Sequence, residues 1–540
     1  MSRPEPDTAT ALIATDHTPL LPAIAEDIPP PSSIANGHGH LRKVADNFPF
    51  TVWLIATIEF CERFAYFGVL GLMQNYIQNP RDDPMRPGGI GLLGQAHATF
   101  VNQSFMIWCF LTPVMGAVVA EQYLGRVKTI LYSAAIDGGG LAILVLSSLP
   151  AVQETAIPLP GLLLSPFLIG VGTGGIKANV SPLLAEQYTS PDLVIRLLKS
   201  GEKVVIDRDL TVQRMFATYF LFINAGCLAA LASVEIEQSY GFSAAFAIPM
   251  TVFIIDFIVF VTSKDRYTSS APDGSIIPNV LRALWITIKH KGNLNYARPA
   301  LVPPESPYQE HPWTNAFIDD LQTALSASKV FFLYPFYWAA FSQLLTNFIS
   351  QAATMQTHGI PNDILPYINP ITTLFLLPLL DRLIFPTIRN LGYAVHHFPR
   401  ITAGFWSAHW PCSTPLSSSG PSTSPPCYDH PRSSTCMHGQ VPNDVSLLLQ
   451  VPAYILVASS ECLASVAGLE YAYANVPKSM RSLIMALYLS TVSVGTFLAM
   501  AVLPLTVDPM ITWMYIVLAM AVFGAGAALW SVPVQRKEAS

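Results

Sequence analysis

The sequence predicts an all-α membrane protein built from two bundles of six transmembrane helices. Of its 540 residues, 51% are hydrophobic and only 12% are charged, with a mean hydropathy of +0.42, whereas about a quarter of the residues in a soluble protein are charged. Apolar runs of roughly 20 residues recur from about residue 50 onward, and each is long enough to cross ~30 Å of hydrocarbon. A long polar connection divides these runs into two sets.

The elements expected along the chain follow from hydropathy and helix-breaking residues. Residues 1–47 are rich in Pro, Ser, Thr and acids and predict a disordered cytoplasmic tail. An N-terminal bundle at 48–262, a cytoplasmic linker at 263–328, a C-terminal bundle at 329–534 and a short tail at 535–540 follow. The expected spans are about 48–77, 97–121, 129–150, 159–188, 214–235, 242–262, 330–356, 365–391, 401–426, 449–476, 482–506 and 510–533.

Basic residues fix the expected orientation. With the N-terminus inside, all but five of the 29 Lys and Arg residues lie in cytoplasmic segments. The five are Arg63 and Lys177, inside spans, and Arg81, Arg86 and Arg432, in outer loops. Such an asymmetry predicts that both termini are cytoplasmic. Six plus six helices around a linker is the layout of secondary transporters, with a substrate site at the midplane between the halves.

Three charges stand close together in the first span. Glu59, Glu62, Arg63 and Tyr66 have the spacing i, i+3, i+4 and i+7, which places them on one helix face. A structural ion pair is one interpretation. Because each charge costs roughly 2.5–3.5 kcal/mol at the bilayer centre, ionisable residues there usually line a pathway, and we favour that interpretation.

The fourth span supplies another buried charge, in GVGTGGIKANVSP. Gly172, Gly174 and Gly175 would let a neighbouring helix approach closely. Lys177 could snorkel outward, but it lies mid-span, so we expect it to face Glu59 and Glu62. Protonation of one Glu would then break the pairing, which makes the arrangement a proton switch.

Five motifs in order resemble a known family, the proton-coupled oligopeptide transporters, a branch of the major facilitator superfamily. EFCERFAYF matches the family's first-helix ExxERFxYY, with Phe67 in place of the last Tyr. GTGGIKANVSP, FLFINAG, GAVVAEQYLGRVKTI and SECLASVAGLEYAYANVPKSMRS match the fourth and fifth helices, the loop between helices 2 and 3, and the tenth helix. The resemblance runs from about residue 50 to 530 and is strongest to fungal di- and tripeptide importers.

The resemblance implies residue roles. It assigns proton coupling to Glu59, Glu62, Arg63 and Lys177. The implied substrate-binding residues are Arg63, Tyr66, Lys177, Asn224 and Glu461, with the basic pair attracting the peptide carboxylate and Glu461 holding the amino group. Two departures, Phe67 and Phe110 in positions often occupied by Tyr, each delete one hydrogen bond to ligand, worth ~0.5–1.5 kcal/mol.

Other candidates have a structural alternative. Gln343 and Asn369 lie near the expected site, but amides also join membrane helices. Tyr337, Trp338 and Tyr488 could line side-chain pockets or simply pack. By the resemblance, Gly125, Arg126 and Lys128 would act as a cytoplasmic gate together with Glu470, although basic residues there also hold the loop inside.

The ninth span is disrupted. WSAHWPCSTPLSSSGPSTSPP, residues 406–426, carries Pro411, Pro415 and Pro421 and an excess of Ser and Thr, so it is not expected to span. A shifted reading frame over residues 409–422 would encode an apolar helix, and sequencing the transcript decides this hypothesis. In the following outer loop Cys427 and Cys436 could form a disulfide, with free thiols as the alternative.

The sequence therefore predicts a proton-coupled symporter that imports di- and tripeptides by alternating access. The alternatives are a carrier of another zwitterionic or anionic solute, a peptide sensor, or an inactive copy if the ninth helix is truly disrupted. We expect no enzyme activity, cofactor, metal or nucleic-acid partner, since neither an HExxH site nor a nucleophile with a suitably spaced base is present. The plasma membrane is the expected location and the vacuolar membrane the alternative.

Overall fold

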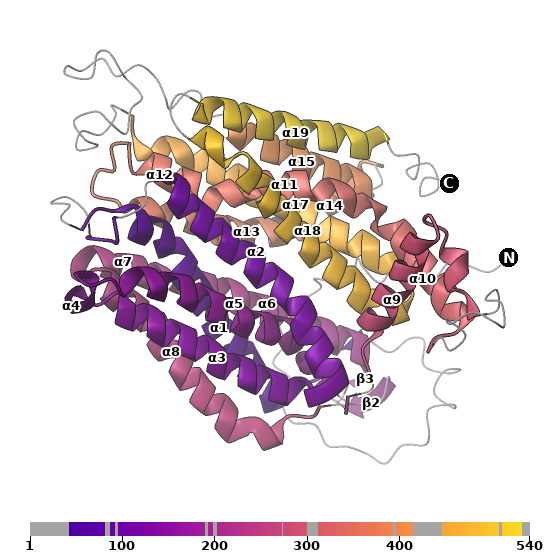
Figure 1. Cartoon of the computed structure of the whole chain (residues 1–540). Helices are drawn as coiled ribbons and strands as arrows, with labels where there is room; N and C mark the ends of the chain where they lie inside the picture. The colour runs from indigo at the N-terminus through magenta and orange to yellow at the C-terminus, as the bar shows by residue number, and fades with distance from the viewer. Residues whose placement is uncertain are drawn as a thin grey trace.

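A computed structural model describes residues 43–81, 87–91, 95–188, 193–197, 202–269, 271–272, 274–299, 312–392, 396–413, 445–506 and 510–531. Two packed groups of helices make up the molecule, the N-terminal one in indigo and magenta and the C-terminal one in orange and yellow (Figure 1). One end of the molecule carries β2, β3, α9, α10 and the C-terminal end of α19, and is called the terminal end below. The opposite end carries α4, α7 and α12 (Figure 1).

The N-terminal group contains seven long helices and one short turn of helix. They are α1 (Phe50–Gln78), α2 (Gln95–Val119), α3 (Arg126–Ser147), α4 (Pro150–Gln153), α5 (Pro158–Glu186), α6 (Arg208–Ala229), α7 (Leu231–Tyr240) and α8 (Phe242–Ser263). Helices α6 and α7 follow each other with a break at Ala230 and together form one membrane-length stretch. The boundaries agree with the expected first six spans to within a few residues.

The C-terminal group is more interrupted. It contains α11 (Tyr334–Phe341), α12 (Asn347–Ala352), α13 (Ile368–Leu379), α14 (Phe385–Asn390), α15 (His397–Ser413), α17 (Val451–Ala474), α18 (Arg481–Ala501) and α19 (Ile511–Ser531). Between the groups, the linker forms α9 (Ile276–Lys289) and α10 (Asn315–Ala327) at the terminal end (Figure 1).

Nine stretches of the described chain are long and apolar enough to cross a membrane. Three predicted spans, the first, seventh and ninth, are not among these nine because of their charge, a break in the helix or their length. Helix α1 is 29 residues long but carries three charges, α11 is separated from α12 by the 3-10 turn Ser342–Leu345, and α15 has only 17 residues. These three still pack among the other helices, so the all-α membrane fold is confirmed.

The ninth helix differs from its predicted span. α15 begins at His397 and remains helical through Pro411 to Ser413, so Pro411 does not break the helix, contrary to expectation. The prediction that residues 406–426 do not span stays a prediction, because residues 414–426 lie outside the described chain. Phe405 is fully buried, and Nδ1 of His409 lies 3.0 Å from the Ala519 carbonyl on α19. At 1.5 Å per residue α15 reaches about 25 Å, and residues 414–444, including Cys427 and Cys436, lie outside the described chain.

A small sheet at the terminal end was not predicted. Its order is β1-β3-β2, where β1 (Lys43–Val44) runs parallel to β3 (Lys203–Asp207) and β2 (Leu193–Leu197) runs antiparallel to β3. Asp46 ties the strands to the bundle, because it accepts a bond of 2.6 Å from Arg196 and its N–H donates to Thr211. Residues 43–46 are therefore structured, which corrects the expectation of a disordered tail for that part.

The glycines of α5 make close helix contacts, as predicted. A Cβ added at Gly172 would lie 2.4 Å from the Cβ of Asp137 on α3, and one at Gly174 would lie 2.3 Å from the Thr112 hydroxyl on α2. Gly175 faces the Ser133 hydroxyl of α3 just as closely. Small residues therefore let α5 pack between α2 and α3, which positions Lys177 inside the bundle.

Candidate functional site

A buried ion cluster occupies the middle of α1. Nε of Arg63 lies 3.1 Å from a carboxylate oxygen of Glu59, and the guanidinium group also pairs with Glu62. Glu59, Glu62 and Arg63 are only 3%, 1% and 6% exposed. The guanidinium carbon of Arg63 lies 5.2 Å from the centre of the Tyr66 ring. The helical spacing therefore brings all four predicted residues of α1 into one cluster.

Helix α6 completes this cluster with a residue that sequence reasoning missed. The buried Tyr219 hydroxyl donates a 2.7 Å hydrogen bond to the other Glu59 oxygen. The approach of α6 depends on Gly226, since a Cβ there would lie 2.4 Å from the Phe60 carbonyl and 3.1 Å from the Cβ of Arg63. Tyr219 directly precedes the FLFINAG motif, but the motif assigned a role to Asn224 alone, and the packing of α6 on α1 is what identifies Tyr219.

We predict that Gly226→Ala destabilises the protein and that Gly524→Ala does not. The added methyl of Gly226→Ala meets backbone of α1, and overpacking of this kind costs typically 1–3 kcal/mol. Gly524 lies on α19 with no atom within 4 Å of an added Cβ, so it is the matched control. Thermal unfolding of the two purified variants in detergent measures the difference. An equal melting temperature for both would contradict the close contact at Gly226.

Lys177 on α5 lies inside the N-terminal group but pairs differently from the expectation. Its ammonium nitrogen lies 3.8 Å from the centre of the Phe110 ring on α2, a cation–π contact worth about 0.5–2 kcal/mol. Among the described residues Lys177 forms no salt bridge, because Arg63 takes both carboxylates. The charge of Lys177 nevertheless interacts with those of Glu59, Glu62 and Arg63. Phe110, noted as a departure from the family pattern, thus forms one wall of the Lys177 environment.

Asp137 on α3 is a second acid that the sequence analysis did not select. It is 2% exposed, accepts a long 3.4 Å hydrogen bond from the Thr173 hydroxyl, and interacts with the charge of Glu62. It packs directly against Gly172 of α5. The N-terminal group therefore holds three buried acids around Arg63 and Lys177.

The C-terminal group contributes Glu461 on α17. The amide of Asn369, on α13, donates a 3.1 Å hydrogen bond to its carboxylate, and Thr373 donates to Asn369 in turn. These bonds hold the carboxylate in place, so two residues predicted separately lie together. Helix α13, which holds Asn369, packs against α6 of the other half, and Cys227 on α6 interacts with the charges of both Glu461 and Arg63.

Aromatic side chains form a wall beside Glu461. The Ser460 hydroxyl donates to the Tyr337 hydroxyl at 3.1 Å, and the indole N–H of Trp338 donates to Thr491 at 3.1 Å. The rings of Trp338 and Tyr488 stand 6.2 Å apart. All three aromatic residues singled out in the sequence are buried here, where they pack against one another.

The amide side chains of Gln343 and Asn224, both predicted to bind substrate, form hydrogen bonds within the protein. Gln343 is fully buried; its amide donates to the Ala339 carbonyl, and its oxygen accepts a 2.6 Å bond from Asn347. The Asn224 amide donates to the Phe220 carbonyl one turn earlier on α6. In this conformation both side chains stabilise helices.

The predicted gate residues of the loop between α2 and α3 lie at the terminal end and form no shared contact among the described residues. Arg126 forms a salt bridge with Glu186, which ends α5 in the same half of the protein. Lys128 is exposed. The Glu470 side chain lies outside the described part of the molecule, so a gate salt bridge to it remains a prediction.

Hydrogen bonds between the two halves gather at the opposite end. Asn75 and Asn362 exchange a reciprocal pair of bonds, both 3.1 Å long. Gln74 donates to the Ser350 hydroxyl at 3.0 Å, and the Asn102 amide donates to the Leu345 carbonyl. These contacts join α1 and α2 to the α11–α12 region and to the turn Asn362–Tyr367, so that end is closed.

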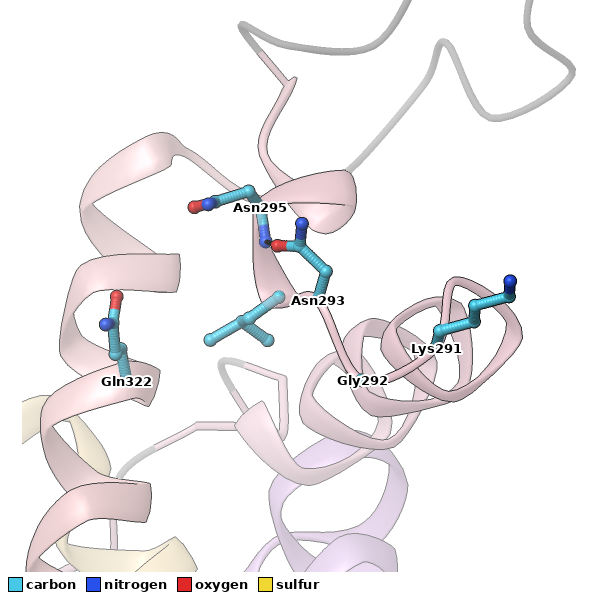
Figure 2. A pocket seen from close by; sticks show the side chains of 6 residues that line it. Lys291, Gly292, Asn293, Asn295 and Gln322 are labelled. Carbon is cyan, nitrogen blue, oxygen red and sulfur yellow. Dashed lines mark hydrogen bonds between the residues drawn. The ribbon is translucent and has the colours of Figure 1, made fainter.

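A surface hollow of about 410 Å³ lies elsewhere, between the end of α9 and α10 (Figure 2). Its lining residues are Lys291, Gly292, Asn293, Leu294, Asn295 and Gln322. None of them belongs to the predicted site, and the hollow is part of the linker. Within the described residues no group of three or more His, Cys, Asp or Glu side chains could hold a metal ion.

The sequence model of the POT family matches residues 127–519. The chain belongs to the POT family. Peptide transporter imqJ of Aspergillus flavus is 58% identical over 304 residues, which is 56% of this chain and 60% of that relative's length. Peptide transporter PTR2 of Saccharomyces cerevisiae is 36% identical over 91% of this chain and 80% of its own.

Solved structures of POT family members have the same fold. The transporter PepTSo aligns with 90% of this chain and 97% of its own, with a TM-score of 0.69 and 20% identity. A POT family transporter in complex with 5-aminolevulinic acid aligns over 89% of this chain and 96% of its own, with a TM-score of 0.65 and 16% identity. The fold expected from the resemblance is confirmed.

Proposed function

We propose that this protein is a proton-coupled symporter that imports di- and tripeptides by alternating access. The observation that carries the proposal is the buried ion cluster of Glu59, Glu62 and Arg63, with the half-buried Lys177 interacting with its charges, and Glu461 held on the other half. A short peptide is a zwitterion, so it needs a positive site and a negative site at opposite ends. Its carboxylate would lie by Arg63 and Lys177, and its amino group by Glu461.

The charge balance of the cluster explains how a proton would be coupled to the solute. We take Asp137 as protonated, because it is buried and forms no salt bridge among the described residues. The two carboxylates of Glu59 and Glu62 and the two cations then sum to zero, so the resting cluster has no surplus charge for an incoming carboxylate. Protonation of Glu59 or Glu62 leaves a surplus positive charge, which binding of the peptide carboxylate then neutralises. Because the low dielectric of the interior strengthens these interactions, proton and peptide bind together better than either binds alone.

The proposed direction of movement follows from topology. We place the terminal end, with its basic residues, in the cytoplasm, so the closed opposite end faces outside and the peptide leaves inward. Residues 48–262 and 329–534 would act as the two moving halves, joined by the linker at 263–328. Each net positive charge that enters gains about 2.3 kcal/mol per 100 mV of membrane potential, which supports uptake against a gradient. A plasma-membrane location suits import of nutrients.

The names of relatives support peptides as the solute. The proteins of Saccharomyces cerevisiae and Schizosaccharomyces pombe that resemble this chain over 91% of its length are a peptide transporter and a probable peptide transporter. Solved POT structures include complexes with alafosfalin and with 5-aminolevulinic acid. Both halves of the proposed site suit a small molecule with separated charges, and Glu461 disfavours a simple anion.

Uptake of a labelled dipeptide into proteoliposomes tests the proposal. We expect uptake when the outside is made acidic, little uptake without a gradient, and alkalinisation of the outside medium as peptide enters. An amino acid of the same side chain and an N-acetylated dipeptide serve as competing solutes. Uptake that ignores the pH gradient would contradict symport, and stronger competition by a simple anion than by dipeptides would contradict the solute class.

A further inference from the structure

Two buried carboxyl groups meet where the two halves join at the opposite end. Glu237 lies on α7 of the N-terminal group, and Asp363 lies in the 3-10 turn Asn362–Tyr367 that leads into α13. Both side chains are 0% exposed. They lie within hydrogen-bonding range of each other, although 126 positions separate them in the sequence. Neither belongs to the ion cluster on α1.

The surroundings of this pair offer no cation to Glu237 in the described chain. No donor forms a hydrogen bond of good geometry with any of the four carboxyl oxygens. A backbone N–H and the Asn75 side chain interact with Asp363, whereas Asp363 is the only hydrogen-bonding neighbour of Glu237 among the described residues. The side chain of Asn75 lies near Asp363 but is engaged with Asn362. The Tyr367 hydroxyl donates to the Phe67 carbonyl at 3.3 Å, and Glu235, a further acid near Asp363, is exposed.

The chemistry of carboxyl groups determines what this contact needs. An ionised carboxylate only accepts hydrogen bonds, whereas a protonated one carries an O–H donor. Two adjacent carboxylates without a cation repel each other, and burial adds a desolvation penalty for each. One proton removes the repulsion and supplies the missing donor, so that a carboxylic acid on one half donates to a carboxylate on the other.

We propose that Glu237 and Asp363 form a second proton-binding site, which holds a proton between the two halves while the outer end is closed and releases it when that end opens. The inference rests on the alternating movement proposed above, but not on which solute is carried. Opening separates α7 from the Asn362–Tyr367 turn and lets water reach both groups, where two ionised carboxylates are stable. The bound proton therefore returns to the outside and is not carried across.

The sign of the pH effect follows from this proton uptake. Closing the outer end binds one proton from the outer solution, so acid favours the closed end and alkali favours the open one. For one proton the ratio of closed to open molecules changes by up to about tenfold per pH unit. Protonation of the cluster on α1 would control peptide binding, whereas protonation of the Glu237–Asp363 pair would control how readily the outer end opens.

The first test measures opening with two spin labels at the outer end. Ser239→Cys on α7 and His358→Cys before the Asn362–Tyr367 turn are exposed sites on the two halves, introduced into the full chain with its native cysteines replaced. In this background we expect the ratio of open molecules, with a long distance between the labels, to closed ones to rise by up to about tenfold for each pH unit toward alkali. Glu237→Gln/Asp363→Asn, whose amides supply permanent donors, should stay closed at every pH. Glu235→Gln, an exposed acid on the same helix, is the matched control and should respond like the parent.

The second test uses the native cysteines and needs no labels. Infrared difference spectra between acid and alkaline buffer should contain the carbonyl stretch of a protonated carboxyl group, which Glu237→Gln/Asp363→Asn removes and Glu235→Gln retains. A full pH response of the labels in the double variant, or an unchanged infrared band, would overturn the proposal. Neither measurement requires a peptide, so a protein that responds as described but takes up no dipeptide refutes the proposed function alone.

Discussion

Lys177→Ala should reduce proton-driven dipeptide uptake at least about tenfold and make the remainder nearly independent of pH. The substitution leaves the carboxylates of Glu59 and Glu62 against Arg63 alone, so the cluster carries a surplus negative charge that repels a peptide carboxylate. One of the acids would then hold a proton permanently, and the step that couples protonation to binding disappears. Initial uptake rates in proteoliposomes over a range of outside pH measure both effects, and the tenfold loss corresponds to about 1.4 kcal/mol.

A charge-balanced double variant separates the coupling role from a structural one. Lys177→Ala/Glu62→Gln restores neutrality, so we expect it to exchange labelled for unlabelled dipeptide without a gradient while still failing to respond to pH. Lys128→Ala removes an exposed lysine of the same half and should behave as the wild type. Full proton-driven uptake by Lys177→Ala would contradict the coupling mechanism, and loss of exchange in the double variant would mean that Lys177 mainly supports the fold.

Local spacing was enough to predict the first part of this site. Glu59, Glu62, Arg63 and Tyr66 lie on one face because the helical repeat fixes them there, and the structure joins them through Arg63. Glycines in α5 similarly predicted close helix contacts. The partner of Lys177 depended on how α2 packs on α5, which no local pattern contains, and the ring of Phe110 took the place where a carboxylate was expected.

Residues that act between distant elements were also missed. Tyr219, Asp137, Glu237 and Asp363 are single polar residues in apolar stretches, and only tertiary packing gives them partners. The sheet has a signal in the sequence, since LVIRL and KVVID are runs rich in β-branched residues on either side of LKSGE. Pro411 predicts a helix break by its residue type, yet α15 continues through it to Ser413.

Glu461→Gln should raise the KM for a dipeptide by about 30-fold or more while leaving the protein folded. Glutamine keeps the size of the side chain and can still bond Asn369, so the loss falls on the charge opposite the amino group of the peptide. Removal of one partner from a buried charge pair costs about 2–5 kcal/mol. Concentration dependence of uptake at a fixed pH gradient gives the KM, and thermal unfolding of the purified variant checks the fold.

The specificity of that loss is the decisive part of the measurement. An N-acetylated dipeptide has no amino charge, so the wild type should bind it much more weakly than the free dipeptide, because Glu461 would be left buried without its cation. In Glu461→Gln the difference between the two ligands should shrink to a few-fold, since neither then meets a carboxylate. Glu235→Gln, an exposed acid outside the site, should keep the full discrimination. If Glu461→Gln still prefers the free amine as strongly as the wild type, the amino group lies elsewhere, and the two halves are not bridged by the opposite charges of one peptide.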